Sequence, residues 1–147
     1  MELSVAEIDT LRIIAGTMIP ADTAFGVPGA DDPAILADIV ESIGRDLPLV
    51  RKALAEIAAR SFVNLDRDKR EALINDCHKS GATPIMALGR LILGAYYRDD
   101  RVLQSLGQEA RAPFPKGYTL EQGDWTLLDA VRKRPPLWRD DRKEFAK

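Results

Sequence analysis

Apolar side chains recur at helical spacing along most of this chain. They stand three or four positions apart with polar residues between them, as in helices that bury one face. The pattern predicts helices over residues 5–17, 33–43, 48–62, 68–79, 83–97 and 100–106. No run of alternating β-branched residues is long enough to predict a strand. We therefore expect an all-α fold, a single-domain bundle of about six helices.

Short polar side chains stand where several of these helices should begin. Ser4 and Glu7 have the spacing of a capping box, in which each side chain accepts the backbone N–H of the other residue. Thr83 is expected to cap the helix of residues 83–97 with its hydroxyl, and the proline after it is favoured in the first helical turn. We interpret the acidic pairs at 31–32 and 99–100 as helix caps rather than as ligands of an ion.

Residues 83–97 (TPIMALGRLILGAYY) form the most apolar of these segments. Two apolar stripes run along it and cover most of its circumference, which predicts a helix buried on nearly all sides. The stripes consist of Ile85, Leu88, Ile92 and Ala95, and of Met86, Gly89, Leu93 and Tyr97. The segment is shorter than the about 20 residues that cross a bilayer. We expect it to be the central helix of the bundle, with no membrane span.

Arg90 is the one charged residue within this helix. A guanidinium buried there needs carboxylate or carbonyl partners. We interpret Arg90 as the cation of a structural ion pair with an aspartate of the loop over residues 19–32. A contact to a partner protein or a ligand is the alternative.

Residues 108–147 differ from the helical body over residues 4–107 and form a long C-terminal arm rich in proline and aromatic residues. Residues 113–118 (PFPKGY) can only be extended or turning. Asp124 begins one more expected helix. The proline pair at 135–136 ends this helix, and the chain after it is expected to be extended.

The large apolar groups of the arm allow two interpretations. The arm completes the core of its own helical body, or part of it is buried only against another protein, because aromatic side chains dominate the energetics of interfaces. The residues predicted to bind a partner are Tyr97, Phe114, Pro115, Tyr118, Trp125, Pro135, Pro136, Leu137 and Trp138.

Composition and charge exclude several classes of protein. The 147 residues suffice for one domain with a real core, and the net charge of −2 gives no general attraction to nucleic acid or to an anionic membrane. Cys77 is the only cysteine and cannot form an internal disulfide. The N-terminus lacks the basic and apolar regions of a signal peptide, so we expect a cytoplasmic chain. A periplasmic location would require export with a partner or a leader that was removed.

Motifs that carry chemistry are not evident. Cys77 and His78 are the only soft metal ligands, and as neighbours on a helix they point about 100° apart, which argues against zinc. We interpret His78 as a surface residue, with catalysis as the less favoured alternative. The nucleophile elbow, the P-loop and the dinucleotide-binding glycine turn do not occur. We predict no catalytic, cofactor-binding or metal-binding residue in this chain.

Four short segments share their order and spacing with a known family. They are residues 11–22 (LRIIAGTMIPAD), 28–30 (PGA), 94–97 (GAYY, with Gly107 downstream) and 113–118 (PFPKGY). In these segments the chain resembles the small subunit of membrane-associated flavin dehydrogenases, the gluconate 2-dehydrogenase subunit 3 family. Many members carry a twin-arginine leader, which does not precede Leu3 here.

The resemblance implies a helical subunit without a redox centre of its own. Its partner would be a large dehydrogenase of the glucose–methanol–choline (GMC) type that holds FAD and oxidises a sugar or an alcohol, with a cytochrome c as a further candidate partner. The small subunit would stabilise and mature the large one. Two alternatives stay open: a stand-alone helical ligand-binding or regulatory module that forms a homo-oligomer, and an enzyme that uses Arg90 with loop aspartates.

Overall fold

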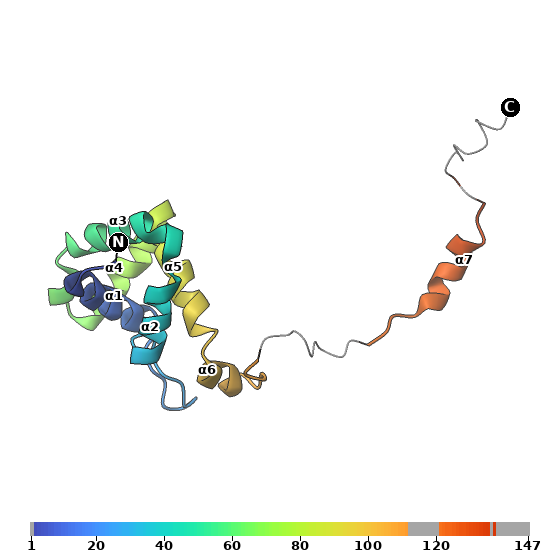
Figure 1. Ribbon diagram of the computed structural model, residues 1–147, viewed down its shortest axis with the longest axis horizontal. Coiled ribbons are helices and arrows are strands. Elements are labelled where there is room, and N and C mark those ends of the chain that lie inside the picture. Colours follow the sequence, from blue (N-terminus) through green and yellow to red (C-terminus); the bar gives the residue numbers. More distant parts are fainter. Residues whose placement is uncertain (1, 112–120, 136, 138–147) are drawn as a thin grey trace. The chain divides into compact units, whose positions relative to one another are not determined.

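The computed structural model describes residues 2–111, 121–135 and 137. Over these residues the chain forms seven α-helices and no strand, which confirms the all-α fold class. The α-helices are α1 (Val5–Met18), α2 (Pro33–Ser42), α3 (Leu47–Ala58), α4 (Arg67–Lys79), α5 (Thr83–Tyr96), α6 (Asp100–Ser105) and α7 (Asp129–Arg132) (Figure 1). Three short 3-10 helices accompany them: η1 (Gly44–Asp46), η2 (Phe62–Asn64) and η3 (Trp125–Leu128).

The chain divides into two compact units, Met1–Arg111 and Ala112–Lys147. The first holds α1 to α6, and the second holds η3 and α7. The sequence predicted a helical body and an arm that meet near residue 107. No helix among the described residues has both the length and the apolar character that a bilayer crossing requires.

Local side-chain contacts explain where the helices begin. Ser4 and Glu7 form the predicted capping box of α1, with the Ser4 N–H donating to Glu7 Oε2 at 2.7 Å. Asp32 and Asp99 cap α2 and α6, each by accepting the backbone N–H two residues later. The prediction that Thr83 caps α5 was wrong. Thr83 is already the first residue of that helix, and no side chain caps it.

The core lies where α5 packs against α2 and α3, while α1 packs against α3 and α4 (Figure 1). The side chains at its centre are almost fully buried. Burial of one such aliphatic group stabilises the fold by about 1.5–3 kcal/mol. The largest of them are Phe62, Leu11, Ile14, Ile35, Ile39, Ile57, Ile92 and Val50.

The central helix is buried on one side only. Its first stripe, which includes Ile85, Leu88 and Ile92, lies in the core as predicted. In the second stripe Gly89 is buried, but Met86, Leu93 and Tyr97 are exposed. Leu93 is 40% exposed and Tyr97 53% exposed, so the prediction of a helix buried on nearly all sides was wrong. The first unit has no further described helix to cover this face, and α5 therefore has an apolar outer face.

Candidate functional site

The described residues among those predicted to bind a partner are all exposed. They are Tyr97, Trp125, Pro135 and Leu137. Tyr97 belongs to the first unit, directly after α5, and the other three belong to the second unit. The remaining predicted residues lie outside the described residues: Phe114, Pro115, Tyr118, Pro136 and Trp138.

The outer face of α5, defined by Met86, Arg90, Leu93 and Tyr97, combines apolar groups with one cation. These four residues are exposed, and their spacing of three or four positions places them on one side of the helix. Gly94 is exposed on the same side, with nothing near the place where a Cβ would stand. A small residue thus lies beside the bulky side chains of Leu93 and Tyr97.

The Tyr97 ring packs against the ring of the preceding residue. The Tyr96 ring is buried and meets the Tyr97 ring edge to face, with centroids 5.3 Å apart. Burial is the main cause that raises the pKa of Tyr96, and the charges of Asp99 and Asp22 act in the same direction. An aromatic pair of this kind adds about 0.5–1.5 kcal/mol beyond its buried area. Tyr97 is thus an exposed ring packed against a buried one.

Arg90 forms an ion pair on this face, but not with the predicted partner. Its Nη2 lies 3.0 Å from Asp46 Oδ2, and Asp46 belongs to η1 rather than to the loop over residues 19–32. The Arg90 side chain is 69% exposed. Burial of the guanidinium was therefore also predicted wrongly, because the outer face faces water. An exposed pair of this kind stabilises a fold by at most about 1 kcal/mol.

The loop before α2 presents an aromatic residue that the sequence analysis missed. Asp22 and Val27 pair their backbones, and Asp22 Oδ1 accepts the Ala24 N–H at 2.8 Å, so the loop has a fixed turn. Phe25 stands at its tip and is exposed, followed by Gly26 at φ 65°. An aromatic residue beside a glycine in a turn is the signal that could have identified it.

A network of ion pairs, called the clasp below, fixes the end of this loop to α6. The Arg101 guanidinium donates to both Asp32 oxygens, at 3.1 and 2.9 Å, and to both Asp99 oxygens, at 3.0 and 2.8 Å. These hydrogen bonds are the main cause that lowers the pKa of Asp32 and of Asp99, and they raise the pKa of Arg101. The clasp therefore joins the starts of α2 and α6.

The described part of the second unit also exposes large apolar groups. Asp124 begins η3 by accepting the Thr126 N–H at 3.0 Å, as the sequence predicted for a helix there. The helix is shorter than a regular one and continues as α7. The exposed large apolar side chains along it are Trp125, Leu127, Leu128 and Val131.

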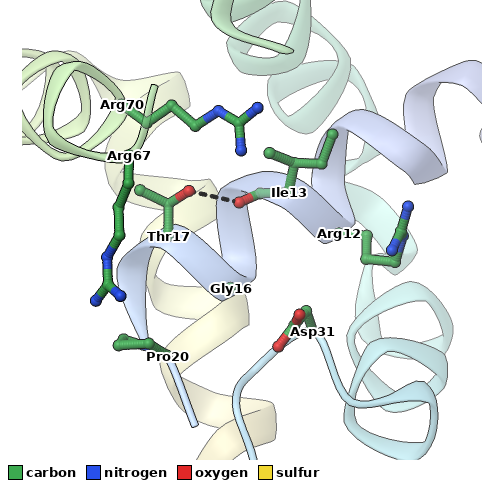
Figure 2. Close-up of a pocket in the computed structure, with 8 residues that line it drawn as sticks. All are labelled: Arg12, Ile13, Gly16, Thr17, Pro20, Asp31, Arg67 and Arg70. Carbon is green, nitrogen blue, oxygen red and sulfur yellow. Dashed lines mark hydrogen bonds between the residues drawn. The ribbon is translucent and has the colours of Figure 1, made fainter. Parts of the chain in front are cut away.

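A separate hollow of about 290 Å³ lies in the first unit, between the second half of α1, the start of α4 and the loop before α2 (Figure 2). Arg12, Arg67 and Arg70 line it together with Asp31, while Thr17 lies between them on α1. The Thr17 hydroxyl is occupied locally, since it donates to Ile13 O at 2.7 Å. No pattern in the sequence indicated this hollow.

His78 and Cys77 occupy the places expected of neighbours on a helix. Cys77 is buried in the core, and His78 is exposed, with Nε2 lying over Gly89 of α5. Among the residues that the structure describes, no three His, Cys, Asp or Glu side chains are grouped as a metal site would require.

Comparison with known proteins yields no relative. No protein-family model matches the sequence, and no curated protein or solved structure matches it either. The resemblance to the gluconate 2-dehydrogenase subunit 3 family thus stays a prediction from the four segments quoted above.

Proposed function

We propose that this chain is a non-catalytic small subunit that stabilises and matures a large FAD-dependent dehydrogenase of the GMC type, acting on a sugar or an alcohol. The observation that supports a binding role is the outer face of α5, where Leu93 and Tyr97 are exposed on a helix whose other side forms the core. FAD belongs to the partner in this proposal, and a cytochrome c is a further candidate in the same complex.

The residues on the outer face suit a protein partner. Tyrosine and tryptophan are enriched among the few side chains that carry most of the binding energy of an interface, and methionine adapts to irregular surfaces. Trp125 in the second unit adds another aromatic group of this kind. A permanent heteromeric interface buries about 2,000 Å² or more and is richly apolar. Exposed apolar groups in both units can supply surface of this character.

The proposed identity of the partner rests on the family resemblance, while the proposed binding role rests on the exposed apolar side chains. Co-expression with a flavoprotein encoded beside this chain separates the two. We expect a yellow complex that co-purifies at fixed stoichiometry, with a higher yield of soluble flavoprotein than without the small subunit.

Two results would count against the proposal. A colourless chain that leaves the yield and activity of the flavoprotein unchanged would contradict the identity of the partner. A closed homo-oligomer, detected by light scattering of the purified chain and disrupted by Leu93→Asp, would favour the stand-alone module instead. Val63→Asp is the matched control, because Val63 is similarly exposed but lies on η2, outside the outer face.

A further inference from the structure

The loop between α1 and α2 presents the Phe25 ring to solvent. This side chain is 74% exposed, more than any other described aromatic group of the first unit, and it is not part of the core. Two backbone hydrogen bonds close the turn below it: the Asp22 N–H donates to Val27 O at 3.1 Å, and the Val27 N–H donates to Asp22 O at 3.0 Å. Packing within the first unit therefore does not account for an aromatic residue at this position.

Hydrogen bonds give the loop its shape before any partner arrives. Asp22 Oδ1 accepts the Ala24 N–H at 2.8 Å and the Phe25 N–H at 3.3 Å. Closer to the helices, the Ala30 N–H donates to Ile19 O at 2.8 Å. Binding through a loop that is already ordered costs less conformational entropy than binding through one that must first be ordered. The loop thus has the property expected of a binding element.

The base of the loop lies beside the end of α5 and the start of α6. Asp32, at the end of the loop, pairs with Arg101 of α6 at 2.9 Å (Figure 1). Burial is the main cause that raises the pKa of Tyr96, and the charge of Asp22 adds to it, so the Asp22 carboxylate lies near the last residue of α5. The loop therefore starts from the end of the first unit where Tyr97 closes the outer face of α5.

Carboxylates outnumber cations at the base of the loop. Asp32 and Asp99 share the Arg101 guanidinium, which donates to both of them. Asp22 forms no ion pair within the part of the chain that the structure describes, and its bonds to backbone N–H groups leave the charge in place. This group of three carboxylates and one guanidinium carries a net negative charge.

The negative charge distinguishes between the occupants that could cover Phe25. A second copy related by a two-fold axis would place the same acidic group against itself. An anionic membrane would repel the carboxylates. A different protein can instead place Lys or Arg side chains opposite them, since interfaces are electrostatically complementary.

We propose that Phe25 inserts into an apolar pocket of the large partner subunit, and that a Lys or Arg side chain at the rim of this pocket pairs with Asp22. Aromatic rings are enriched in the buried centres of interfaces. The inference rests on the function proposed above, because the flavoprotein is the occupant. It extends the interface from the outer face of α5 to the loop before α2.

The complex of the full chain with the flavoprotein encoded beside it tests the role of Phe25. Sedimentation of the diluted complex, followed by flavin absorbance, measures its Kd. F25A should raise the Kd at least about tenfold and leave the melting temperature of the chain unchanged, because the ring is outside the core. Val5→Ala is the matched control, since Val5 is about as exposed but lies at the other end of α1 from the loop.

The outcomes separate the two proposals. An equal Kd for F25A and the natural chain would overturn the role of Phe25 and leave the proposed function standing. Failure of the natural chain to form any complex with the flavoprotein would overturn both.

D22N tests the charge at the rim. Asparagine can accept the same backbone N–H groups, so the turn should remain while the charge is lost. The Kd of the natural complex should rise with salt, and D22N should raise the Kd about threefold at low salt and reduce this salt dependence. A salt dependence equal to that of the natural complex would overturn the pairing of Asp22.

The other occupants have their own readouts. Light scattering detects self-association of the isolated chain, and sedimentation with vesicles of equal parts phosphatidylcholine and phosphatidylserine detects membrane binding. Either interaction, if present in the natural chain and lost in F25A, would assign the loop to a second copy or to a membrane and would overturn the proposal. We expect neither.

Discussion

The Asp32 carboxylate both caps a helix and takes part in an ion pair. It caps α2 through the Ala34 N–H at 3.0 Å and accepts two hydrogen bonds from Arg101. The Arg101 side chain is the largest cause that lowers the pKa of Asp32, while burial acts against it. Because the folded pKa is lower than the unfolded one, this contribution to stability is present above the unfolded pKa of about 3.9 and is lost as pH falls through the folded pKa.

The first prediction separates the cap from the charge. Asp32→Ala should lower the free energy of unfolding by about 1–2 kcal/mol at pH 7, because it removes both the N-cap and the carboxylate bonded to Arg101. Asp32→Asn should cost less, since asparagine caps a helix about as well as aspartate does. Urea unfolding at pH 7 and again below pH 3 measures both. The cost of Asp32→Asn should shrink at low pH, where the natural carboxyl is protonated.

Asp100→Ala serves as the control for this comparison. Asp100 is an exposed aspartate in the first turn of α6, beside the clasp but not part of it. Its replacement should change stability little at either pH. Equal costs for Asp32→Ala and Asp32→Asn would contradict the assignment of the cap.

The second prediction concerns two glycines that lie against the same aspartate. A Cβ at Gly16 would stand 2.8 Å from Asp31 Cγ, and this exposed side chain can move. A Cβ at Gly29 would stand 2.9 Å from the backbone N of Ala21, which cannot. Gly16→Ala should therefore change stability by less than about 1 kcal/mol, because alanine is the better helix former, whereas Gly29→Ala should cost about 1–3 kcal/mol. Thermal unfolding of the two variants checks the contrast. A larger loss at Gly16 than at Gly29 would show that Asp31 is fixed.

At the scale of the element, α5 shows what local patterns can and cannot predict. The start and end of this helix followed from the proline at position 84 and from the apolar run, both of which act locally. Its burial did not follow, because apolar periodicity shows which sides can pack but not whether another helix lies there. Arg90 was assigned to the wrong partner for the same reason, since Asp46 stands on η1, a short turn of helix between α2 and α3.

The hollow that holds Arg12 and Arg67 could not be found from the sequence either. Its residues come from α1, α4 and a loop, and only the packing of α1 on α4 brings them together. In the sequence, each arginine stands near acidic residues, and nothing marks it as part of a shared site. The partial signal was two arginines three positions apart at the start of α4, where the helix dipole disfavours them.

The third prediction tests the two sides of α5 with adjacent residues. Ile92 is fully buried and Leu93 is exposed. Ile92→Ala should lower the free energy of unfolding by about 2–5 kcal/mol through lost burial and the cavity it leaves. Leu93→Ala should stay within about 0.5 kcal/mol of the natural chain, as surface changes usually do. Chemical denaturation measures both, and a similar loss for the two would mean that the outer face is covered in solution.

At the scale of the whole molecule, the division into two units locates the source of stability. Every described residue of the hydrophobic core lies between Leu3 and Val102, within the first unit. The exposed apolar groups divide differently, with Leu93 and Tyr97 in the first unit and Trp125 in the second. Stability should therefore depend on the first unit alone, whereas partner binding should depend on side chains of both units.

The last prediction follows from this separation. A chain of residues 1–111 keeps the whole described core, so it should retain cooperative unfolding and a melting temperature within a few degrees of the full chain, measured by circular dichroism. If the second unit supplies interface anchors, the same chain should bind the flavoprotein more weakly by about 2 kcal/mol or more, or about thirtyfold in Kd. Leu93→Asp in the full chain provides the matched comparison, because it alters the outer face alone. A chain of residues 1–111 that unfolds without cooperativity would show that the second unit completes the core. Unweakened binding by a folded 1–111 chain would instead confine the interface to the first unit.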